Sequence, residues 1–373
     1  MVRFGPGDHR LIRVITHDAV SACAPGRVEL LGNHTDYNGG VVLGAAINRV
    51  MCVSGARNDK SIRIRSGGFG EVEIDVANLR PLSDARWANY ILGVAAELRQ
   101  LRVPIHGFKG EVCGDVPIGS GLSSSAALEL ATALFLLKLF PFELSRLEIA
   151  KACQRAEHRY VGVQSGLLDQ VVSLFGRAQH AVFFDCRTEE ICTVPFPSSL
   201  ALIIADSGTQ RELASGKYNL RRTETQTAAA AFGVRALRDL NLAQINEREN
   251  IPDLLRRRAR HVVEENDRVW RAVELLKRGD GRGFGKLMNE SHESSRRNFE
   301  NSTRELDLLV SIAQQLPGVL GARLTGAGFG GATVTLCEKS AAAVVAQQLA
   351  KNYAAQTGIK PLVFVCEIAD GAR

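Results

Sequence analysis

The first part of the chain alternates short apolar and polar runs, which predicts strands. Residues 23–31 and 41–46 are apolar segments on either side of a polar loop, and a separate strand is expected over 50–56. Apolar side chains recur with a period of two over 61–65 and 71–76, as they do in half-buried strands. This part of the chain therefore predicts a sheet.

Apolar residues at helical spacing follow, interrupted by further short strands. Helices are expected over 87–101, 123–140 and 144–160. Long charged helices are expected as far as about residue 315, and a last helix over 340–351. The remaining expected strands are 107–113, 181–184, 201–205, 318–323, 332–336 and 361–367. Because strands come early and helices are segregated, the pattern favours an α+β fold over strict βαβ alternation.

The length of 373 residues predicts two domains at ~150 residues each. The junction is expected near residues 190–200, which gives domains over 1–195 and 196–373. The 45% hydrophobic content excludes a disordered chain. A net charge of +6 fits an anionic ligand, but a solvated basic surface explains it equally well.

The cysteines and the apolar runs indicate the cellular compartment in which we expect the protein. The eight cysteines show no C-x-x-C pair and no metal-finger spacing, which predicts scattered thiols in a reducing compartment. Residues 1–20 carry charges throughout and lack the apolar core of a secretory signal. The apolar stretch 126–140 is shorter than a membrane span and is interrupted by Glu129 and Lys138. We expect a cytoplasmic protein that has no membrane partner.

A glycine-rich loop over 114–126 lies between an expected strand and an expected helix. Glycines let the backbone approach a ligand closely, and the helix start presents unpaired N–H groups to an anion. The serines at 123–125 can cap that helix, donate to phosphate oxygens or bind Mg²⁺. The loop lacks the Gly-Lys-Ser/Thr of a P-loop, and its G-x-G-x-x-G pattern is incomplete. A serine-capped turn without a ligand is the alternative interpretation.

Two more clusters combine glycines with polar side chains. Residues 324–332 hold four glycines in six positions before a strand, which indicates close backbone contact or, alternatively, a β-bulge. Residues 24–40 place Asn33, His34 and other polar side chains between two apolar strands. Such a set can surround a polyhydroxylated ligand, whereas an Asx-type turn before a hairpin is the alternative.

These three clusters together resemble the GHMP small-molecule kinases and, within them, the galactokinase family. Residues 26–40 resemble the sugar-kinase signature, 117–126 the ATP loop and 324–331 the third motif. Further resembling segments follow in the family's order, at 87–90, 166–170, 217–222, 258–263 and 287–292. The resemblance runs from about Arg13 to Glu367. It implies a two-lobed fold with mixed sheets, helices packed on them and an active site between the lobes.

The resemblance implies transfer of the ATP γ-phosphoryl group to the anomeric 1-hydroxyl of galactose, with Mg²⁺. It assigns Asp169 as the catalytic carboxylate and Arg27 as its partner. The chemistry agrees, because the attacking hydroxyl must lose a proton that a carboxylate can accept. Mg²⁺ is assigned to Ser125 and Glu157. Nucleotide contacts are assigned to Gly119, Ser120, Gly121, Leu122, Ser123, Ser124 and Ser125, and sugar contacts to Asn33, His34, Thr35, Asp36, Gly166 and Tyr218.

One position departs from the family. Galactokinases usually carry Glu where this chain has Asn33, and that carboxylate accepts a hydrogen bond from the sugar 6-hydroxyl. The interpretation we favour is that the Asn33 carbonyl accepts the same bond, at a cost of ~1 kcal/mol. The alternative is an altered sugar specificity, with galacturonate, N-acetylgalactosamine or arabinose as the substrate.

Two other functional classes compete with an enzyme. A non-catalytic galactose and ATP sensor resembles the kinase but typically has a shortened serine loop, whereas the loop is complete here. A nucleic-acid binder would use the basic run 255–261, but this run continues into Glu264 and Glu265 and is typical of a solvated helix face. We expect small-molecule substrates, no nucleic acid and a monomer.

Overall fold

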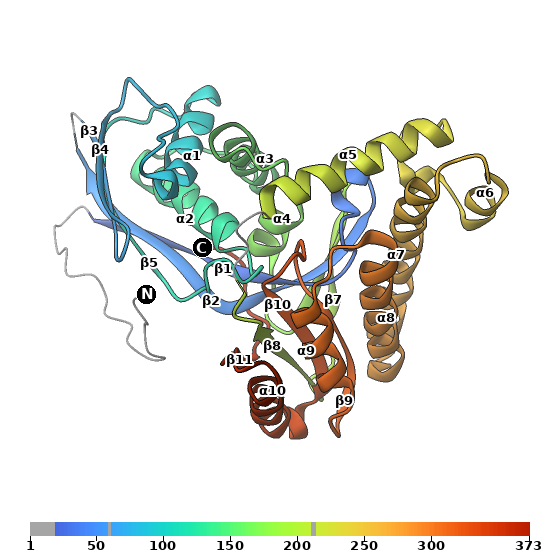
Figure 1. The fold of residues 1–373 in the computed structure, drawn as a ribbon. Helices are drawn as coiled ribbons and strands as arrows, with labels where there is room; N and C mark the ends of the chain where they lie inside the picture. The colour runs from blue at the N-terminus through green and yellow to red at the C-terminus, as the bar shows by residue number, and fades with distance from the viewer. Residues whose placement is uncertain (1–18, 59–60, 210–213) are drawn as a thin grey trace.

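The computed structural model describes residues 19–58, 61–209 and 214–373, and two sheets form the framework of this part (Figure 1). The large sheet has the order β4-β3-β5-β2-β6-β7, with β1 paired to β2, and the small sheet has the order β11-β8-β10-β9. All these pairings are antiparallel except that of β3 with β5. The large sheet contains β1 (Val20–Leu31), β2 (Val41–Arg57), β3 (Ser61–Ser66), β4 (Gly70–Asp75), β5 (Phe108–Gly114), β6 (His180–Asp185) and β7 (Ile191–Pro195). The small sheet contains β8 (Leu200–Asp206), β9 (Val319–Leu324), β10 (Ala332–Glu338) and β11 (Leu362–Cys366).

β2 is one long strand, whereas the sequence predicted two strands in its place. It pairs with β6 over Val41–Gly44 and with β5 over Met51–Arg57. The exposed Asn48 falls between these two pairings, so its polarity marks a change of partner rather than a turn. The strand therefore continues through a stretch whose pattern predicts a break.

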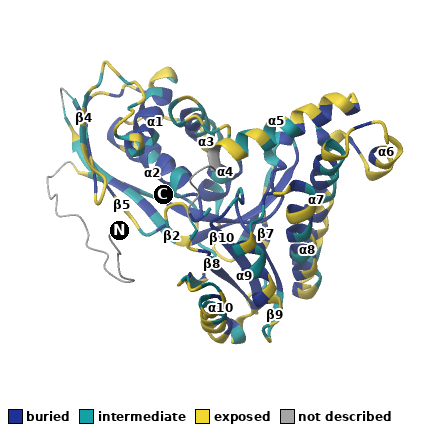
Figure 2. Ribbon diagram, in the orientation of Figure 1, coloured by how far each residue is buried: buried dark blue, intermediate teal, exposed yellow. Residues whose placement is uncertain are grey.

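Four helices cover one face of the large sheet (Figure 1). These are α1 (Asn89–Gln100), α2 (Ser124–Leu139), α3 (Arg146–Ala156) and α4 (Leu168–Phe175). α2 packs against β1 and β2 and is buried over most of its length (Figure 2), which explains why it is apolar nearly all round. A π-helical turn, Glu157–Val161, follows α3 and ends at Gly162. The sequence predicted a single helix here that extends to residue 160.

Three of the remaining helices pack on the small sheet, and the others lie against the large sheet or against one another. The remaining helices are α5 (Ala214–Phe232), α6 (Leu242–Glu247), α7 (Asp253–Lys277), α8 (Gly281–Ser294), α9 (Arg304–Gln314) and α10 (Ala342–Thr357). α9 and α10 pack on the small sheet, and α8 packs on β9. α7 also contacts β2 and β7, and its Trp270 meets Phe183 of β6 at 4.9 Å between ring centroids. α7 thus bridges the two lobes.

Two elements went unpredicted. α4 contains Asp169 in its first turn, and the sequence predicted no helix over these residues. β7 forms the edge of the large sheet within the region 190–200 expected to be a junction, although β7 ends at Pro195 and the small sheet begins at Leu200. The expectation of a domain boundary near 195 stays a prediction.

Residues 368–373 return to the large sheet. Ile368 forms a bridge with Ile47 of β2, and Ala372 donates its N–H to Ser173 of α4 at 2.9 Å. Arg373 and Cys23 exchange backbone hydrogen bonds of 3.0 and 3.1 Å along the edge of β1 that faces away from β2. A segment that follows the small sheet in the sequence therefore covers the outer edge of β1.

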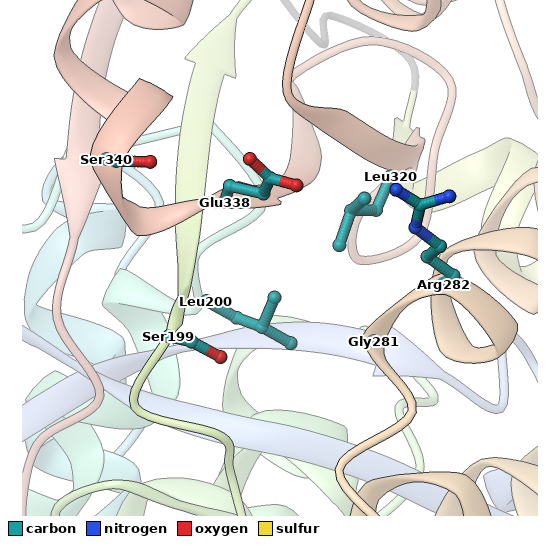
Figure 3. A pocket seen from close by; sticks show the side chains of 7 residues that line it. All are labelled: Ser199, Leu200, Gly281, Arg282, Leu320, Glu338 and Ser340. Atoms are coloured by element: carbon teal, nitrogen blue, oxygen red, sulfur yellow. The ribbon is translucent and has the colours of Figure 1, made fainter.

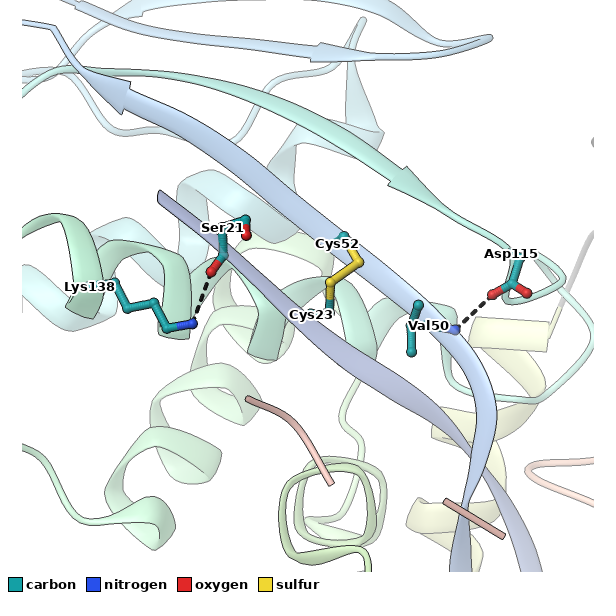
Figure 4. Close-up of a disulfide and its surroundings, with 6 residues drawn as sticks. All are labelled: Ser21, Cys23, Val50, Cys52, Asp115 and Lys138. Carbon is teal, nitrogen blue, oxygen red and sulfur yellow. Dashed lines mark hydrogen bonds between the residues drawn. A yellow bond between two sulfur atoms is a disulfide. The ribbon is translucent and has the colours of Figure 1, made fainter. Parts of the chain in front are cut away.

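Cys23 and Cys52 form a disulfide that joins β1 to β2 (Figure 4). The prediction of scattered thiols is wrong for this pair. Its cause is the register, because the two residues are directly opposite each other in antiparallel strands and their side chains lie on one face. The other six cysteines are free, namely Cys113, Cys153, Cys186, Cys192, Cys337 and Cys366.

The described ranges 19–58, 61–209 and 214–373 lack both a membrane-spanning helix and a cluster of metal-binding side chains. Within them, no helix combines the length and the apolar character that crossing a bilayer requires. Nor does any group of three or more His, Cys, Asp or Glu side chains in these ranges form a ready-made metal cage.

Candidate active site

The three glycine clusters meet at one place. Arg27 of the first cluster donates its N–H to the carbonyl of Leu122 in the second, at 3.0 Å. A Cβ added to Gly326 of the third cluster would lie 2.8 Å from the carbonyl oxygen of Gly121, so only glycine permits this approach. Segments from both lobes therefore close on the loop that precedes α2.

Asp169 lies at the centre of this meeting point. Its Oδ1 accepts from Arg27 Nε at 2.8 Å and lies 2.5 Å from Arg27 Nη2, while Arg27 Nη1 donates to Gly121 O at 2.6 Å. Its Oδ2 accepts from the hydroxyl of Ser123 at 2.5 Å. The Asp169 side chain is 26% exposed and that of Arg27 only 5%, so the carboxylate is accessible while its partner is fixed.

Ser123 has a second effect, on the helix it precedes. Its backbone is left-handed, with φ of 57°, and it stands at the N-cap of α2 without making a side-chain cap bond. Because its hydroxyl donates to Asp169, the first N–H groups of α2 receive no cap from this serine. A helix start left in this way favours an anion such as phosphate.

The remaining residues of the predicted nucleotide loop divide into two groups. Ser120 and Leu122 are buried, and the Ser120 hydroxyl donates to Pro117 O at 2.7 Å, so their side chains shape the loop from inside. Ser124 and Ser125 are half-buried in the first turn of α2. Gly119 has open space beside its Cα, where a ligand can approach the backbone.

Two buried carboxyl groups, those of Glu157 and Glu129, lie near the start of α2. Glu157, in the π-helical turn, accepts from the Ser165 hydroxyl, and burial together with the charge of Asp169 raises its pKa to about 7. Glu129 of α2 accepts from Gln170 Nε2 at 3.0 Å, and burial and the nearby Glu157 raise its pKa well above its usual value. A divalent cation near Glu157 would offset this unfavourable negative charge, and carboxylate and hydroxyl oxygens are the ligands that Mg²⁺ prefers.

The loop that follows β1 carries a cluster of aromatic rings. The His34 ring lies 4.6 Å from that of Phe299 and 5.2 Å from that of Tyr218, which comes from α5. Burial lowers the pKa of His34 to about 3, so the imidazole is neutral. Its Nε2 donates to Ala327 O at 3.0 Å, and its Nδ1 accepts from the Tyr37 hydroxyl at 2.7 Å. The apolar faces and hydroxyls of this cluster suit a sugar ring.

Asp36 and Gly166 are in close contact beside these rings. A Cβ at Gly166 would overlap the Asp36 carboxylate and lie 2.7 Å from the Asp36 Cβ. Burial and the charge of Asp169 raise the pKa of Asp36 to about 7. The structure thus brings Asp36, Gly166, Tyr218 and Asp169 into one region, as the sequence predicted for the sugar side.

Asn33 and Thr35 are placed differently from the other predicted sugar contacts. Asn33 is fully buried, and its Nδ2 donates to Glu29 Oε1 and to Gly326 O, each at 2.8 Å. Its Oδ1 accepts from Asn301 at 2.8 Å and from Ser295 at 3.4 Å. These four bonds use the whole capacity of the amide. A carboxylate at position 33 would lie next to the Glu29 carboxylate, and the two negative charges would repel each other. This repulsion gives a physical reason for an amide at position 33.

Thr35 acts within the loop. Its side chain is fully buried, and its hydroxyl lies 2.8 Å from Gly32 O and 2.7 Å from Val41 O. These bonds tie the two ends of the loop together.

Glu265 of α7 supports the loop that follows β1. It is fully buried and accepts from Gly32 N–H at 3.0 Å, Ser291 Oγ at 2.6 Å and Arg268 Nε at 2.7 Å. Burial alone would raise its pKa, but the Arg268 and Arg323 guanidiniums outweigh burial and hold the pKa well below its usual value. The sequence indicated a solvated helix face here, which is wrong for Glu265 and for the buried Arg258.

We expect Glu265→Gln to lower the free energy of unfolding by about 3 kcal/mol, because it leaves the buried Arg268 guanidinium without its closest carboxylate. Urea denaturation would measure the change. Glu293→Gln is the matched control, since it breaks ion pairs with exposed Arg296 and Arg297 and should cost about 1 kcal/mol or less. Equal losses in the two variants would contradict this role of Glu265.

A pocket of about 360 Å³ lies elsewhere, at the outer end of the small sheet (Figure 3). Glu338 and Arg282 face it from β10 and α8, and Leu200 and Leu320 form its apolar wall. None of the predicted site residues lines it. It is therefore separate from the region around Asp169.

Comparison with known proteins identifies the family. Residues 14–57 match the galactokinase galactose-binding signature, 89–177 the GHMP kinase N-terminal domain and 272–355 the GHMP kinase C-terminal domain. A galactokinase of Roseiflexus sp. is 42% identical over 95% of this chain and 93% of its own length. One of Haemophilus influenzae is 41% identical over 95% and 94%. The chain belongs to the galactokinase family.

Solved structures agree with this membership. The crystal structure of Lactococcus lactis galactokinase complexed with galactose matches with a TM-score of 0.92 and 34% identity, over 96% of this chain and 95% of that one. The Methanococcus jannaschii mevalonate kinase, at 19% identity and a TM-score of 0.70 over 96% and 100%, shares the fold. The predicted GHMP kinase fold is thus confirmed for this galactokinase family member.

Proposed function

We propose that this chain transfers the γ-phosphoryl group of ATP to the 1-hydroxyl of galactose, giving galactose 1-phosphate and ADP. One observation carries the proposal. Asp169 is held between Arg27 and Ser123 at the point where β1 meets the loop before α2. A carboxylate at this junction can reach both a sugar bound on one side and a phosphate bound on the other. The galactose in the related Lactococcus lactis structure agrees with this sugar class.

The loop before α2 is the nucleotide side of the proposed site. The uncapped start of α2 and the open backbone at Gly119 offer N–H groups to the ATP phosphates. The guanidinium of Arg27 adds a fixed positive charge near the γ-phosphoryl position. Phosphoryl transfer depends mostly on such positioning and charge neutralisation.

Ser125 and Glu157 are the residues we propose to hold Mg²⁺. The raised pKa of Glu157 supports this, because a cation stabilises the charged form of a buried carboxylate. When bound, Mg²⁺ would neutralise charge on the phosphate oxygens. Gln170 donates to Glu129, which stabilises the buried end of this acidic group.

The loop after β1 is the sugar side. Asp36 accepts hydrogen bonds from sugar hydroxyls, and His34 and Tyr218 contribute ring surface and polar atoms. Asp169 accepts the proton of the 1-hydroxyl as the oxygen attacks phosphorus. The Ser123 hydroxyl is free to rotate, so it can keep its hydrogen bond while Asp169 gains a proton. Asn33 supports the loop through Glu29 and Gly326 rather than through the sugar.

A coupled assay of ADP release with a sugar panel tests the proposal. We expect galactose to give the highest kcat/KM among galactose, N-acetylgalactosamine, galacturonate and arabinose. The reaction without sugar is the control. Equal or better turnover of galacturonate would overturn the assigned substrate, and the absence of any sugar-dependent ADP release would favour a sensor.

Galactose binding should depend on the ionisation of Asp36. Its pKa is raised to about 7, so the carboxylate that accepts sugar hydrogen bonds forms only as the pH rises through that value. We expect the Kd for galactose to increase about tenfold when the pH falls from about 8 to about 6. Isothermal titration without nucleotide would measure it. Glu157→Gln should keep the same profile, and a flat profile in the unmodified chain would contradict the prediction.

A further inference from the structure

Three cysteines lie in a row across neighbouring strands of the large sheet. Cys52 on β2 is directly opposite Cys23 on β1 and, on its other edge, directly opposite Cys113 on β5. Directly opposite residues of antiparallel strands project their side chains from the same face. The adjoining Val53 and Val112 are buried in the core, so the cysteine row lies on the opposite face, and Cys113 is exposed there.

The backbone hydrogen bonds define both cysteine pairs. Cys23 directs its N–H and C=O to Arg373, away from β2, so Cys23 and Cys52 are a pair without backbone hydrogen bonds. The N–H and C=O of Cys52 then point toward β5, and Cys52 with Cys113 is a hydrogen-bonded pair. The Cα atoms of such a pair are about 5.5 Å apart, within the range of about 4.4–6.8 Å in which disulfides form. Cys52 therefore has a second partner within reach.

The register that keeps Cys113 beside Cys52 is held firmly at this end of the strands. Asp115 donates its N–H to Val50 O at 2.9 Å, and its carboxylate accepts from Val50 N–H at 2.8 Å (Figure 4). Arg49 adds an ion pair of 3.1 Å to the same carboxylate. These contacts lie two residues from both cysteines, so β5 cannot slide along β2 without breaking them.

We propose that Cys23, Cys52 and Cys113 form a thiol–disulfide exchange site, at which the disulfide moves between Cys23–Cys52 and Cys52–Cys113. The Cys113 thiolate attacks Cys52 Sγ, a new S–S bond forms, and the bond to Cys23 breaks. Cys23 leaves as a thiolate and takes up a proton from water, which replaces the proton that Cys113 released. The number of disulfides is unchanged, so the step needs no oxidant or reductant.

The exchange would move a covalent link between two segments of the active site. β1 carries Arg27, and β5 leads into the loop before α2. A Cys23–Cys52 bond ties β2 to the first of these strands, and a Cys52–Cys113 bond ties it to the second. Burial and the charge of Glu111 raise the pKa of the Cys113 thiol, so the exchange should be slow and requires a long incubation before it is stopped.

Peptide mapping of the full chain tests the proposal without reference to enzyme activity. Trypsin places the three cysteines in separate peptides, residues 14–27, 50–57 and 110–138. The chain is incubated with oxidised glutathione, quenched with acid, alkylated and mapped without reduction. We expect both disulfides in the unmodified chain and Cys23–Cys52 alone in Cys113→Ser. In Cys23→Ser, the predominant disulfide of Cys52 should be with Cys113.

The test has a matched control variant and a defined result that would contradict the proposal. Cys192→Ser removes an exposed thiol on β7 and should give the same map as the unmodified chain. The disulfides of the unmodified chain are mapped as well, so the test remains possible if Cys23→Ser fails to fold. If the unmodified chain forms only Cys23–Cys52 after this incubation, the exchange site is overturned.

Discussion

Asp169→Asn should lower kcat by a factor of about 10²–10⁴, which is the usual contribution of a positioned general base. The substitution preserves the shape of the side chain, and its carbonyl can still accept from Arg27. It removes the group that we propose takes the proton of the attacking hydroxyl, and it leaves the Arg27 charge without its partner. Steady-state ADP release would measure kcat, and titration calorimetry would measure galactose affinity, which should change little.

Ser123→Ala is the matched control for this variant. It removes one hydrogen bond to Asp169 and leaves the carboxylate in place. Loss of a hydrogen bond to a charged group costs about 1.5–3 kcal/mol, so we expect a fall in kcat of about 10- to 100-fold. Near-normal turnover by Asp169→Asn would remove the role assigned to this carboxylate, whatever Ser123→Ala does.

Gly166→Ala should weaken galactose binding by about 10- to 100-fold. The added Cβ overlaps the Asp36 carboxylate, so Asp36 must leave the position in which we propose that it meets the sugar. The loss corresponds to one hydrogen bond to a charged group, about 1.5–3 kcal/mol. ATP affinity should be unaffected, because neither residue lies in the loop before α2. Calorimetric titration with each substrate separates the two effects.

The chain offers a glycine-to-alanine control close by. Gly216 lies in α5 two residues before Tyr218, and a Cβ there meets nothing within 4 Å. Gly216→Ala should leave galactose affinity unchanged and raise helix stability by up to about 1 kcal/mol. In the background of Asp36→Ala, Gly166→Ala should cost less than it does alone, because its effect passes through Asp36. Additive losses would show that Gly166 acts in another way.

The sequence alone predicted those parts of the candidate site that are built from segments adjacent in the chain. A glycine loop, a strand before it and a helix after it are adjacent in the chain, so residues 114–126 predicted the start of α2 and its loop. The pairing of Asp169 with Arg27 was predicted from the family resemblance, not from the spacing of the two residues. Ser123 could not be assigned by position alone, because whether a serine caps its helix or turns to a distant carboxylate depends on tertiary contacts.

The supporting residues could not be predicted for a related reason. Glu265 stands in a run of charges that is typical of a solvated helix, and only packing against the loop after β1 makes it a buried acceptor. α4 is short and lies between Gly166 and Gly176, so its pattern resembles a loop. The Cys23–Cys52 bond depends on strand register, which cysteine spacing does not reveal.

The coverage of β1 by residues 368–373 also bears on how the chain folds. Contacts between Cys23 and Arg373 are among the most distant in sequence that a chain of this length can make. As synthesis proceeds, β1 can pair with β2 early, but its outer edge stays open until the small sheet and its helices have been made. The strand that carries Arg27 thus completes its pairing after both lobes exist. The pairing of both edges of this strand therefore depends on the order of synthesis as well as on the final contacts.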